Sequence, residues 1–125
     1  MLSTHASSDV RVFVVWLRMY PGDEEGKWPR TVFTDARITQ RWDEPKLAGA
    51  WFLDHLQHLT PAHAVAGKFP QDVDAMWDTW MLFDRGARWT DVPGGLLSWG
   101  YTIMDTNAQL TKDFNALSPG KGPGR

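Results

Sequence analysis

The amino-acid sequence predicts a single α/β domain in which helices cover a mixed sheet. Three observations lead to this fold class. The chain has 125 residues, which is the size of one domain with one core. Its apolar residues recur with strand-like spacing in some segments and with helical spacing in others. The segments follow one another in the order β–α–β–α–β–β–α, which favours two parallel strands, then an antiparallel hairpin and a last helix.

The first predicted strand is Val10–Leu17, VRVFVVWL. Its nearly continuous run of β-branched and aromatic residues is typical of a strand buried on both faces, so we expect it at the centre of the sheet. A Pro-Gly pair at 21–22 predicts a turn after it. The loop that follows has room for a short helix at Pro29–Phe33, because proline is tolerated at the first helical position.

The second predicted strand, Asp35–Asp43, alternates between two faces. One face carries Ala36, Ile38, Gln40 and Trp42, and the other carries Arg37, Thr39 and Arg41. The second face is therefore expected to meet solvent. Pro45 then opens a helix that spans Lys46–Leu59. Residues 60–75 hold two prolines and a glycine, and they predict a connecting loop with room for one helical turn.

The second half of the chain begins with a strand-like segment, Trp77–Phe83. Asp84–Ala87 predicts a tight hairpin turn, with glycine where a positive φ is needed. We expect Arg88–Thr90 to begin the return strand, and Leu96–Ile103 to continue it after a Pro-Gly-Gly interruption.

The last predicted helix follows a capping box. Thr106 and Gln109 have the spacing at which each side chain satisfies the other residue's backbone amide, so the helix is expected to start there. Leu110, Phe114 and Leu117 recur at i, i+4 and i+7 and predict its buried stripe. We expect the domain to span residues 9–117, between a disordered N-terminus at 1–8 and a disordered Gly/Pro tail at 118–125.

The composition argues against several classes of function. The net charge is −2 and the basic residues are scattered, so neither nucleic acid nor an anionic membrane is an expected partner. No apolar run approaches the ~20 residues of a membrane span, and the N-terminus lacks the pattern of a secretory signal. We therefore expect a cytoplasmic protein. The chain has no cysteine, which excludes disulfides, thiolate metal sites and thiol catalysis.

Several segments resemble the thioredoxin-like fold family. MLFDRGAR resembles the thioredoxin hairpin, NAQLTKDFNAL resembles its terminal helix, and VFVVWLRMYPGDEE stands where thioredoxins have a central strand and a redox loop. DARITQRWDE and WDTWMLFDRGARW are similar to segments of an uncharacterised bacterial group of thioredoxin-like proteins. The resemblance covers roughly residues 10–117 and implies a thioredoxin-like mixed sheet covered by helices.

The chain departs from this family at both of its functional signatures. The loop at 18–23, RMYPGD, holds no thiol, and no proline stands near Asp78-Thr79, where the family has its cis-proline. Thiol–disulfide exchange requires a thiolate. The resemblance therefore implies the scaffold without the activity.

Three hypotheses for function follow. The first is a redox-inactive thioredoxin-like domain that binds a protein partner or forms a homodimer. The alternative is a small-molecule binder or unrecognised enzyme with its pocket at the loop after the first strand. A cysteine-bearing partner that supplies the missing thiol is a third. The candidate binding residues are Met19, Tyr20, Asp23, Arg37, Trp42, Asp43, Asp78 and Trp80. No catalytic residue, cofactor or metal ligand is predicted.

Some candidate residues also have structural interpretations. The eight tryptophans either fill the core or, in part, line a ligand cleft or an interface. Asp43 either frames a ligand together with Arg37 and Trp42 or caps the next helix, and the cap is favoured. His55 and His58 stand one helical turn apart, close to His63, but surface histidines at a helix end are favoured over a metal site.

Overall fold

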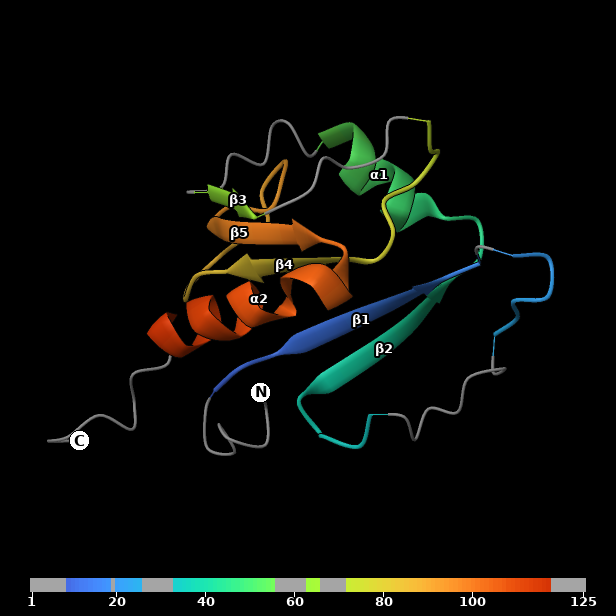
Figure 1. The fold of residues 1–125 in the computed structure, drawn as a ribbon. Coiled ribbons are helices and arrows are strands. Elements are labelled where there is room, and N and C mark those ends of the chain that lie inside the picture. Colours follow the sequence, from blue (N-terminus) through green and yellow to red (C-terminus); the bar gives the residue numbers. More distant parts are fainter. Residues whose placement is uncertain (1–8, 19, 26–32, 56–62, 66–71, 118–125) are drawn as a thin grey trace, which may run out of the picture.

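The computed structural model describes residues 9–18, 20–25, 33–55, 63–65 and 72–117, which form a small mixed α/β domain with two sheets (Figure 1). The elements are β1 (Val12–Leu17), β2 (Ile38–Asp43), α1 (Leu47–His55), β3 (His63–Val65), β4 (Thr79–Phe83), β5 (Leu96–Tyr101) and α2 (Ile103–Leu117). The predictions for 1–8, Met19, the helix at Pro29–Phe33 up to residue 32, the helix end after 55 and the tail at 118–125 fall on residues outside these ranges.

β1 and β2 form a parallel two-stranded sheet in which Val12 is paired with Ile38 and Leu17 with Asp43. The predicted alternation of Asp35–Asp43 is only partly present: β2 begins at Ile38 and Arg41 is exposed, but Arg37 and Thr39 are half-buried and Ala36 is exposed. On the inner face of the sheet, Gln40 accepts a hydrogen bond from Trp16 Nε1 at 3.0 Å. The prediction that β1 is central and buried on both faces is wrong. Phe13 is 70% exposed and Val15 is 43% exposed. An apolar run indicates strand preference, but burial also requires an element against each face.

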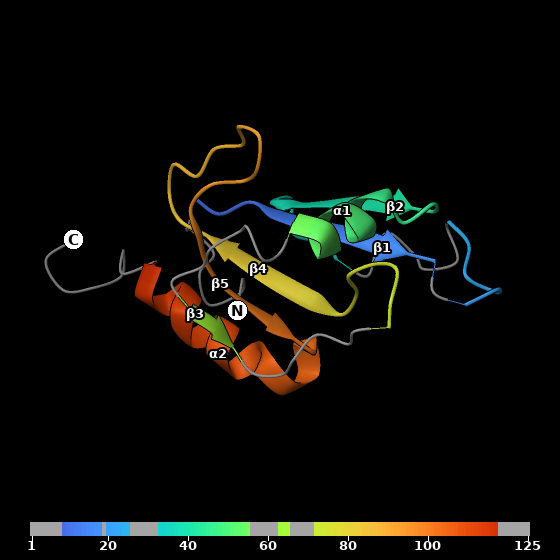
Figure 2. The same cartoon turned by 90° about the horizontal axis from the view of Figure 1, so that it is seen from above.

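β3, β5 and β4 form the second sheet in that order, with β3 parallel and β4 antiparallel to β5 (Figure 2). The prediction of a loop throughout 60–75 is wrong at His63–Val65, which pairs along the edge of β5. That strand is only three residues long, too short for an alternating pattern to be visible in the sequence.

The connection between β4 and β5 is longer than a tight hairpin. The predicted turn forms, with Ala87 N donating to Asp84 O and with Gly86 at φ 72°. However, Arg88–Thr90 is not the return strand. The chain makes an excursion and comes back at Gly95, whose carbonyl accepts from Asp84 N at 2.8 Å. Within this excursion, Trp89 and Pro93 form an isolated antiparallel bridge.

α2 begins at Ile103, so the predicted start of the last helix at Thr106 is wrong. Thr102 and Asp105 form the reciprocal cap: Asp105 N donates to Thr102 Oγ1, and Thr102 Oγ1 donates to Asp105 Oδ2 at 3.0 Å. Thr102 and Thr106 are both followed three residues later by a side chain that can accept a hydrogen bond, so spacing alone does not distinguish them. Thr106 lies inside the helix and is buried.

The core lies between α2 and the β4–β5 pair (Figure 1). Trp80 of β4, Leu96 of β5 and Phe114 of α2 are buried there. Leu110 and Leu117, the other members of the predicted stripe, are half-buried. Two polar contacts join α2 to the strands. Trp80 Nε1 donates to Thr106 Oγ1 at 2.7 Å, and Ser98 Oγ donates to Asp113 Oδ2 at 2.8 Å.

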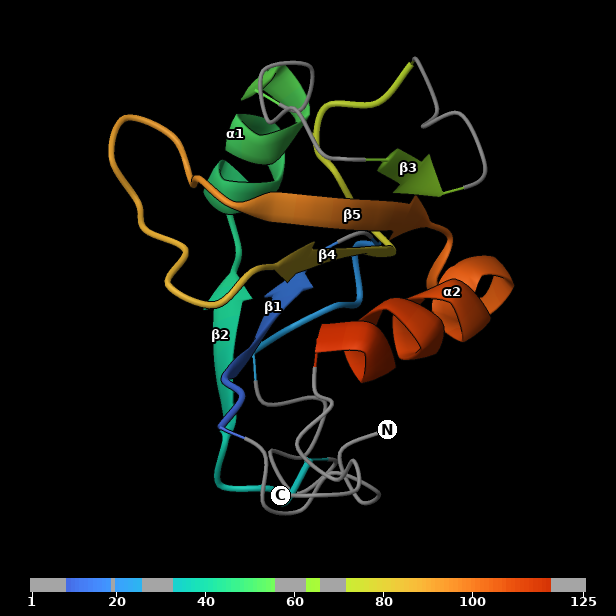
Figure 3. The ribbon, with the colours of Figure 1, turned by 90° about the vertical axis from the view of Figure 1, so that its left-hand side faces the viewer.

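A close backbone approach connects the first half of the chain to the second. Met76 N donates to Gly49 O at 2.9 Å, and a Cβ on Gly49 would lie 3.0 Å from both Ala75 Cβ and Met76 O. Glycine permits this approach because it carries no side chain. On the other side of α1, the excursion at 84–95 lies beside the helix (Figure 3), and Trp51 contacts Trp89.

Candidate functional site

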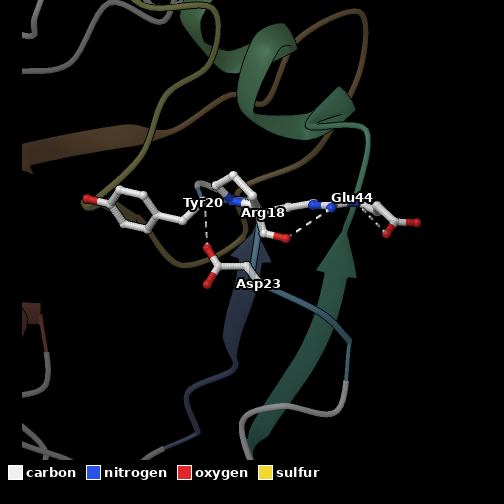
Figure 4. Close-up of polar contacts among 5 residues, drawn as sticks. Arg18, Tyr20, Asp23 and Glu44 are labelled. Atoms are coloured by element: carbon white, nitrogen blue, oxygen red, sulfur yellow. Dashed lines mark hydrogen bonds and ion pairs between the residues drawn. The ribbon is translucent and has the colours of Figure 1, made fainter.

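The carboxyl ends of β1 and β2 form one edge of their sheet, and this edge is the first candidate site. Parallel strands in register end at the same edge, where open α/β sheets bind ligands. Arg18 follows β1 and reaches across this edge (Figure 4). Its guanidinium lies 3.5 Å from Glu44 Oε1 and also donates to Pro21 O at 3.2 Å. The ion pair is exposed, so it contributes about 0–1 kcal/mol.

Tyr20 and Asp23 form a closed turn in the loop after β1 (Figure 4). Tyr20 N donates to Asp23 Oδ2 at 2.9 Å, and Asp23 N donates to Tyr20 O at 3.0 Å. These bonds occupy polar groups that a ligand could otherwise use. The aromatic ring of Tyr20 is 74% exposed and is the part of this turn that can contact another molecule. Met19, also a candidate, lies outside the described residues.

Asp43 caps α1. Its carboxylate accepts hydrogen bonds from Leu47 N at 2.7 Å, Ala48 N at 2.8 Å and Gly49 N at 3.2 Å. Lys46 adopts a positive φ of 58°, in the turn that brings the start of α1 back over Asp43. The positive end of the helix dipole is thus occupied by a carboxylate of the chain itself, which leaves these three amides unavailable to an anionic ligand.

Trp42 stands next to Asp43 on the inner face of β2 and is half-buried. Its Nε1 is buried without an acceptor among the described residues, as is Nε1 of Trp77. A buried donor without an acceptor costs about 1–3 kcal/mol. A hydrogen-bond acceptor placed next to Nε1 of Trp42 would therefore stabilise the fold.

Arg37 stands just before the start of β2 and six positions before Asp43. At ~3.3 Å per residue the two are roughly 20 Å apart. Asp35 accepts from Arg37 Nε at 2.9 Å and from Nη2 at 2.6 Å. These hydrogen bonds lower the pKa of Asp35 to about 2 and raise the pKa of Arg37. The structure therefore does not bring Arg37 together with Trp42 and Asp43 around one ligand.

Asp78 and Trp80, the last two candidates, hold the fold. Asp78 adopts a positive φ of 49°, which aspartate tolerates better than most residues, and its Oδ1 accepts from Ile103 N at 3.2 Å. Trp80 is buried against Thr106. Neither side chain completes a pocket with the Tyr20 turn by any contact that the structure shows.

A surface that the sequence reasoning missed is the outer face of the β1–β2 sheet. It is formed by Phe13 and Val15 of β1 and by Thr39 and Arg41 of β2, with Arg11 just before β1 and the Leu17–Asp43 pair at its carboxyl end. Paired residues of neighbouring strands point to the same face, and Phe13 is paired with Thr39 and Val15 with Arg41. The polar face of β2 was visible in the sequence. The register that places Phe13 and Val15 on the same face is known only from the structure, so the sequence did not identify them as exposed.

A second aromatic group lies between α1 and the excursion at 84–95. Trp51 stacks on His55 with ring centroids 4.0 Å apart, and it contacts Trp89 at 5.0 Å and Phe52 at 5.1 Å. His55 Nδ1 lies 2.7 Å from Trp51 O. The rings cover one another, which indicates a packing role. His58 and the side chain of His63 lie outside the described residues.

No protein-family model, curated protein or solved structure matches this chain. In the described part of the chain, no helix is long and apolar enough to cross a membrane. No three His, Cys, Asp or Glu side chains gather there as a metal site would require. What the fold and its surface define is a small mixed α/β domain with an exposed, partly apolar strand face.

Proposed function

We propose that the chain is a redox-inactive, thioredoxin-like binding domain that docks onto another protein surface through the outer face. The observation that carries this proposal is the exposure of Phe13, which is 70% exposed in the middle of a strand. Large exposed apolar side chains on a regular, rigid element are typical of protein–protein contacts. The chain contains no cysteine, so the thiol chemistry of such a scaffold is not available to it.

The strand directions support a thioredoxin-like arrangement. β1 and β2 are parallel, β4 and β5 form an antiparallel pair, and α2 packs against that pair. In Figure 1, β5 points in the same general direction as β1, and β4 points the opposite way. The family has one continuous sheet, whereas here β1–β2 and β3–β5–β4 are separate and β3 is additional. Nuclear Overhauser contacts between the backbones of β1 and β4 are expected for the family arrangement, and their absence would contradict it.

Docking on the outer face would gain free energy mainly from Phe13 and Val15. Full burial of a phenylalanine or valine side chain contributes about 1.5–3 kcal/mol. Because both side chains are already partly covered, the available gain is smaller than the sum of two such values. The face is also presented by paired strands, so little conformational entropy is lost when a partner covers it.

The test compares Phe13→Ser with the control Met104→Ser, because Met104 is 86% exposed at the start of α2, away from the outer face. Light scattering over a range of concentrations measures self-association, and a random peptide library selected on the wild-type chain supplies binding peptides. We expect Phe13→Ser to abolish the dimer or the peptide binding, and Met104→Ser to retain it. A monomer with no peptide that distinguishes the two variants would refute the proposal.

The alternative function, a small-molecule site at the loop after β1, is favoured by the exposure of Tyr20 in that loop and by Nε1 of Trp42, which is buried without an acceptor among the described residues. A ligand present at 100 times its Kd stabilises a protein by ~2.7 kcal/mol, which a thermal-shift screen of metabolites and metal ions detects. A ligand of this site is expected to lose its effect in Tyr20→Ala. Silence across a broad library would exclude this alternative.

A further inference from the structure

Given the proposed docking role of the outer face, we infer that its partner is an extended, acidic protein segment with an apolar side chain between two acidic ones. The outer face combines apolar and basic side chains. Phe13 stands two residues after Arg11, which lies just before β1, and Val15 is paired with Arg41 of β2.

Arg11 and Arg41 are exposed and form no ion pair with a described acid. Arg41 Nη1 donates only to the carbonyl of Gln40, at 3.1 Å. Arg37, the basic residue just before β2, is unlike Arg41 in that it forms an ion pair with Asp35, which neutralises its charge. Asp9 is the nearest acid in sequence to Arg11, and no ion pair joins the two. The face is thus positive although the chain as a whole carries a net charge of −2.

The spacing of the arginines specifies the shape of the partner. Arg41 is paired with Val15, which stands four residues after Arg11. At ~3.3 Å per residue the two guanidinium groups are anchored roughly 13 Å apart. An extended peptide with acidic residues about four positions apart matches this distance, and its middle residue then lies over Phe13. Guanidinium groups bind carboxylates with two parallel hydrogen bonds, which favours glutamate or aspartate at both positions.

A second copy of this chain fits the outer face less well. Two copies placed face to face would bring four arginines together, and Asp43, the acid at the carboxyl end of this face, is already engaged by three amides of α1. Like charges at an interface oppose association. A nucleic acid or an anionic membrane is also disfavoured, because two guanidinium groups provide little of the charge that such polyanions require, and Phe13 and Val15 occupy the centre.

The experiment uses the full chain and a short, blocked, fluorescent peptide that has two glutamates about four positions apart and a leucine midway. Fluorescence anisotropy measures its affinity, and a second peptide replaces both glutamates by glutamine. We expect the glutamine peptide, and the variants Arg11→Gln and Arg41→Gln, to weaken binding by up to about fivefold for each charge pair removed. Arg88→Gln is the matched control, since Arg88 is exposed on the 84–95 excursion, and it is expected to change nothing.

The outcomes separate this inference from the proposed docking role. Equal affinity for the two peptides, with binding still lost in Phe13→Ser, would overturn the acidic partner and retain docking. A dimer that depends on Phe13, without any peptide binding, would overturn the acidic partner and show that a second copy of the chain docks on the outer face. Arginine-dependent binding to vesicles containing phosphatidylserine, without peptide binding, would also overturn it. If no binding of any kind depends on Phe13, both the inference and the proposed function fail.

Discussion

Replacement of Gly100 by alanine tests the packing between β5 and α2. Gly100 is buried in β5, and a Cβ at this position would lie 2.6 Å from Thr106 Oγ1, 2.6 Å from Trp80 Nε1 and 2.7 Å from Trp80 Cε2. These are the atoms of the buried hydrogen bond between Trp80 and Thr106, which is 2.7 Å long. The methyl group of alanine therefore cannot enter without separating the indole from the hydroxyl.

The size of the effect follows from three contributions. A buried N–H that loses its acceptor costs about 1–3 kcal/mol. Overpacking of a close-packed interior costs about 1–3 kcal/mol more. Alanine offsets about 0.4–1 kcal/mol of this loss, because it has less backbone freedom than glycine in the unfolded chain. We expect Gly100→Ala to lower the free energy of unfolding by roughly 1–5.5 kcal/mol, a large part of the stability of a small domain.

Urea unfolding followed by circular dichroism measures this loss. Gly94→Ala is the control, since the nearest atom to its added Cβ would be Arg88 O at 3.4 Å, an ordinary contact. In the background of Thr106→Val, which already removes the hydrogen bond, Gly100→Ala should cost less than in the wild type, because the two changes share one interaction. The reasoning is refuted if Gly100→Ala and Gly94→Ala differ by less than about 0.5 kcal/mol, the usual scatter of surface substitutions.

Two further predictions concern the ends of β2. Asp43→Ala removes the acceptor of three amides at the start of α1, so it should lower the free energy of unfolding, measured in urea, by about 1–2 kcal/mol. The control Glu44→Gln removes only an exposed ion pair and should lower it by at most about 1 kcal/mol. Equal losses in the two variants would contradict the capping role of Asp43. The pKa of Asp35 is lowered to about 2 by its hydrogen bonds with Arg37, so its contribution to stability is present above the unfolded value of ~3.9 and is lost as the pH falls through about 2. An NMR titration of the Asp35 carboxyl should show this pKa rise towards 3.8 in Arg37→Gln, and an unchanged value would show that another group lowers it.

The elements that local patterns predict best are those whose side chains repeat along the chain. Val12–Leu17, Ile38–Asp43 and Thr79–Phe83 all lie within predicted strands. Each carries β-branched or aromatic residues in an extended run, and this preference acts within a few residues of the chain. The predicted cap by Asp43 is also local, because it depends only on an acid placed just before a helix.

The errors concern choices that depend on distant residues. Thr106 has the spacing of a helix cap, but its hydroxyl accepts from Trp80, which is 26 residues away in the chain, and Thr102 provides the cap instead. The excursion at 84–95 likewise depends on which residue pairs with the end of β4, and Leu96 rather than Arg88 pairs with Phe83. Single-sequence patterns carry no information on such pairings.

By itself, the sequence determined that the chain is an α/β domain, that strands precede a last amphipathic helix and that no thiol chemistry is available to it. Those properties follow from composition and from short-range periodicity. Only the tertiary structure decided that Trp80 and Asp78 hold α2 rather than line a pocket, and that Phe13 and Val15 face solvent. The physical reason is that the burial of a side chain depends on the residues that pack against it. Those residues belong to segments far away in the chain.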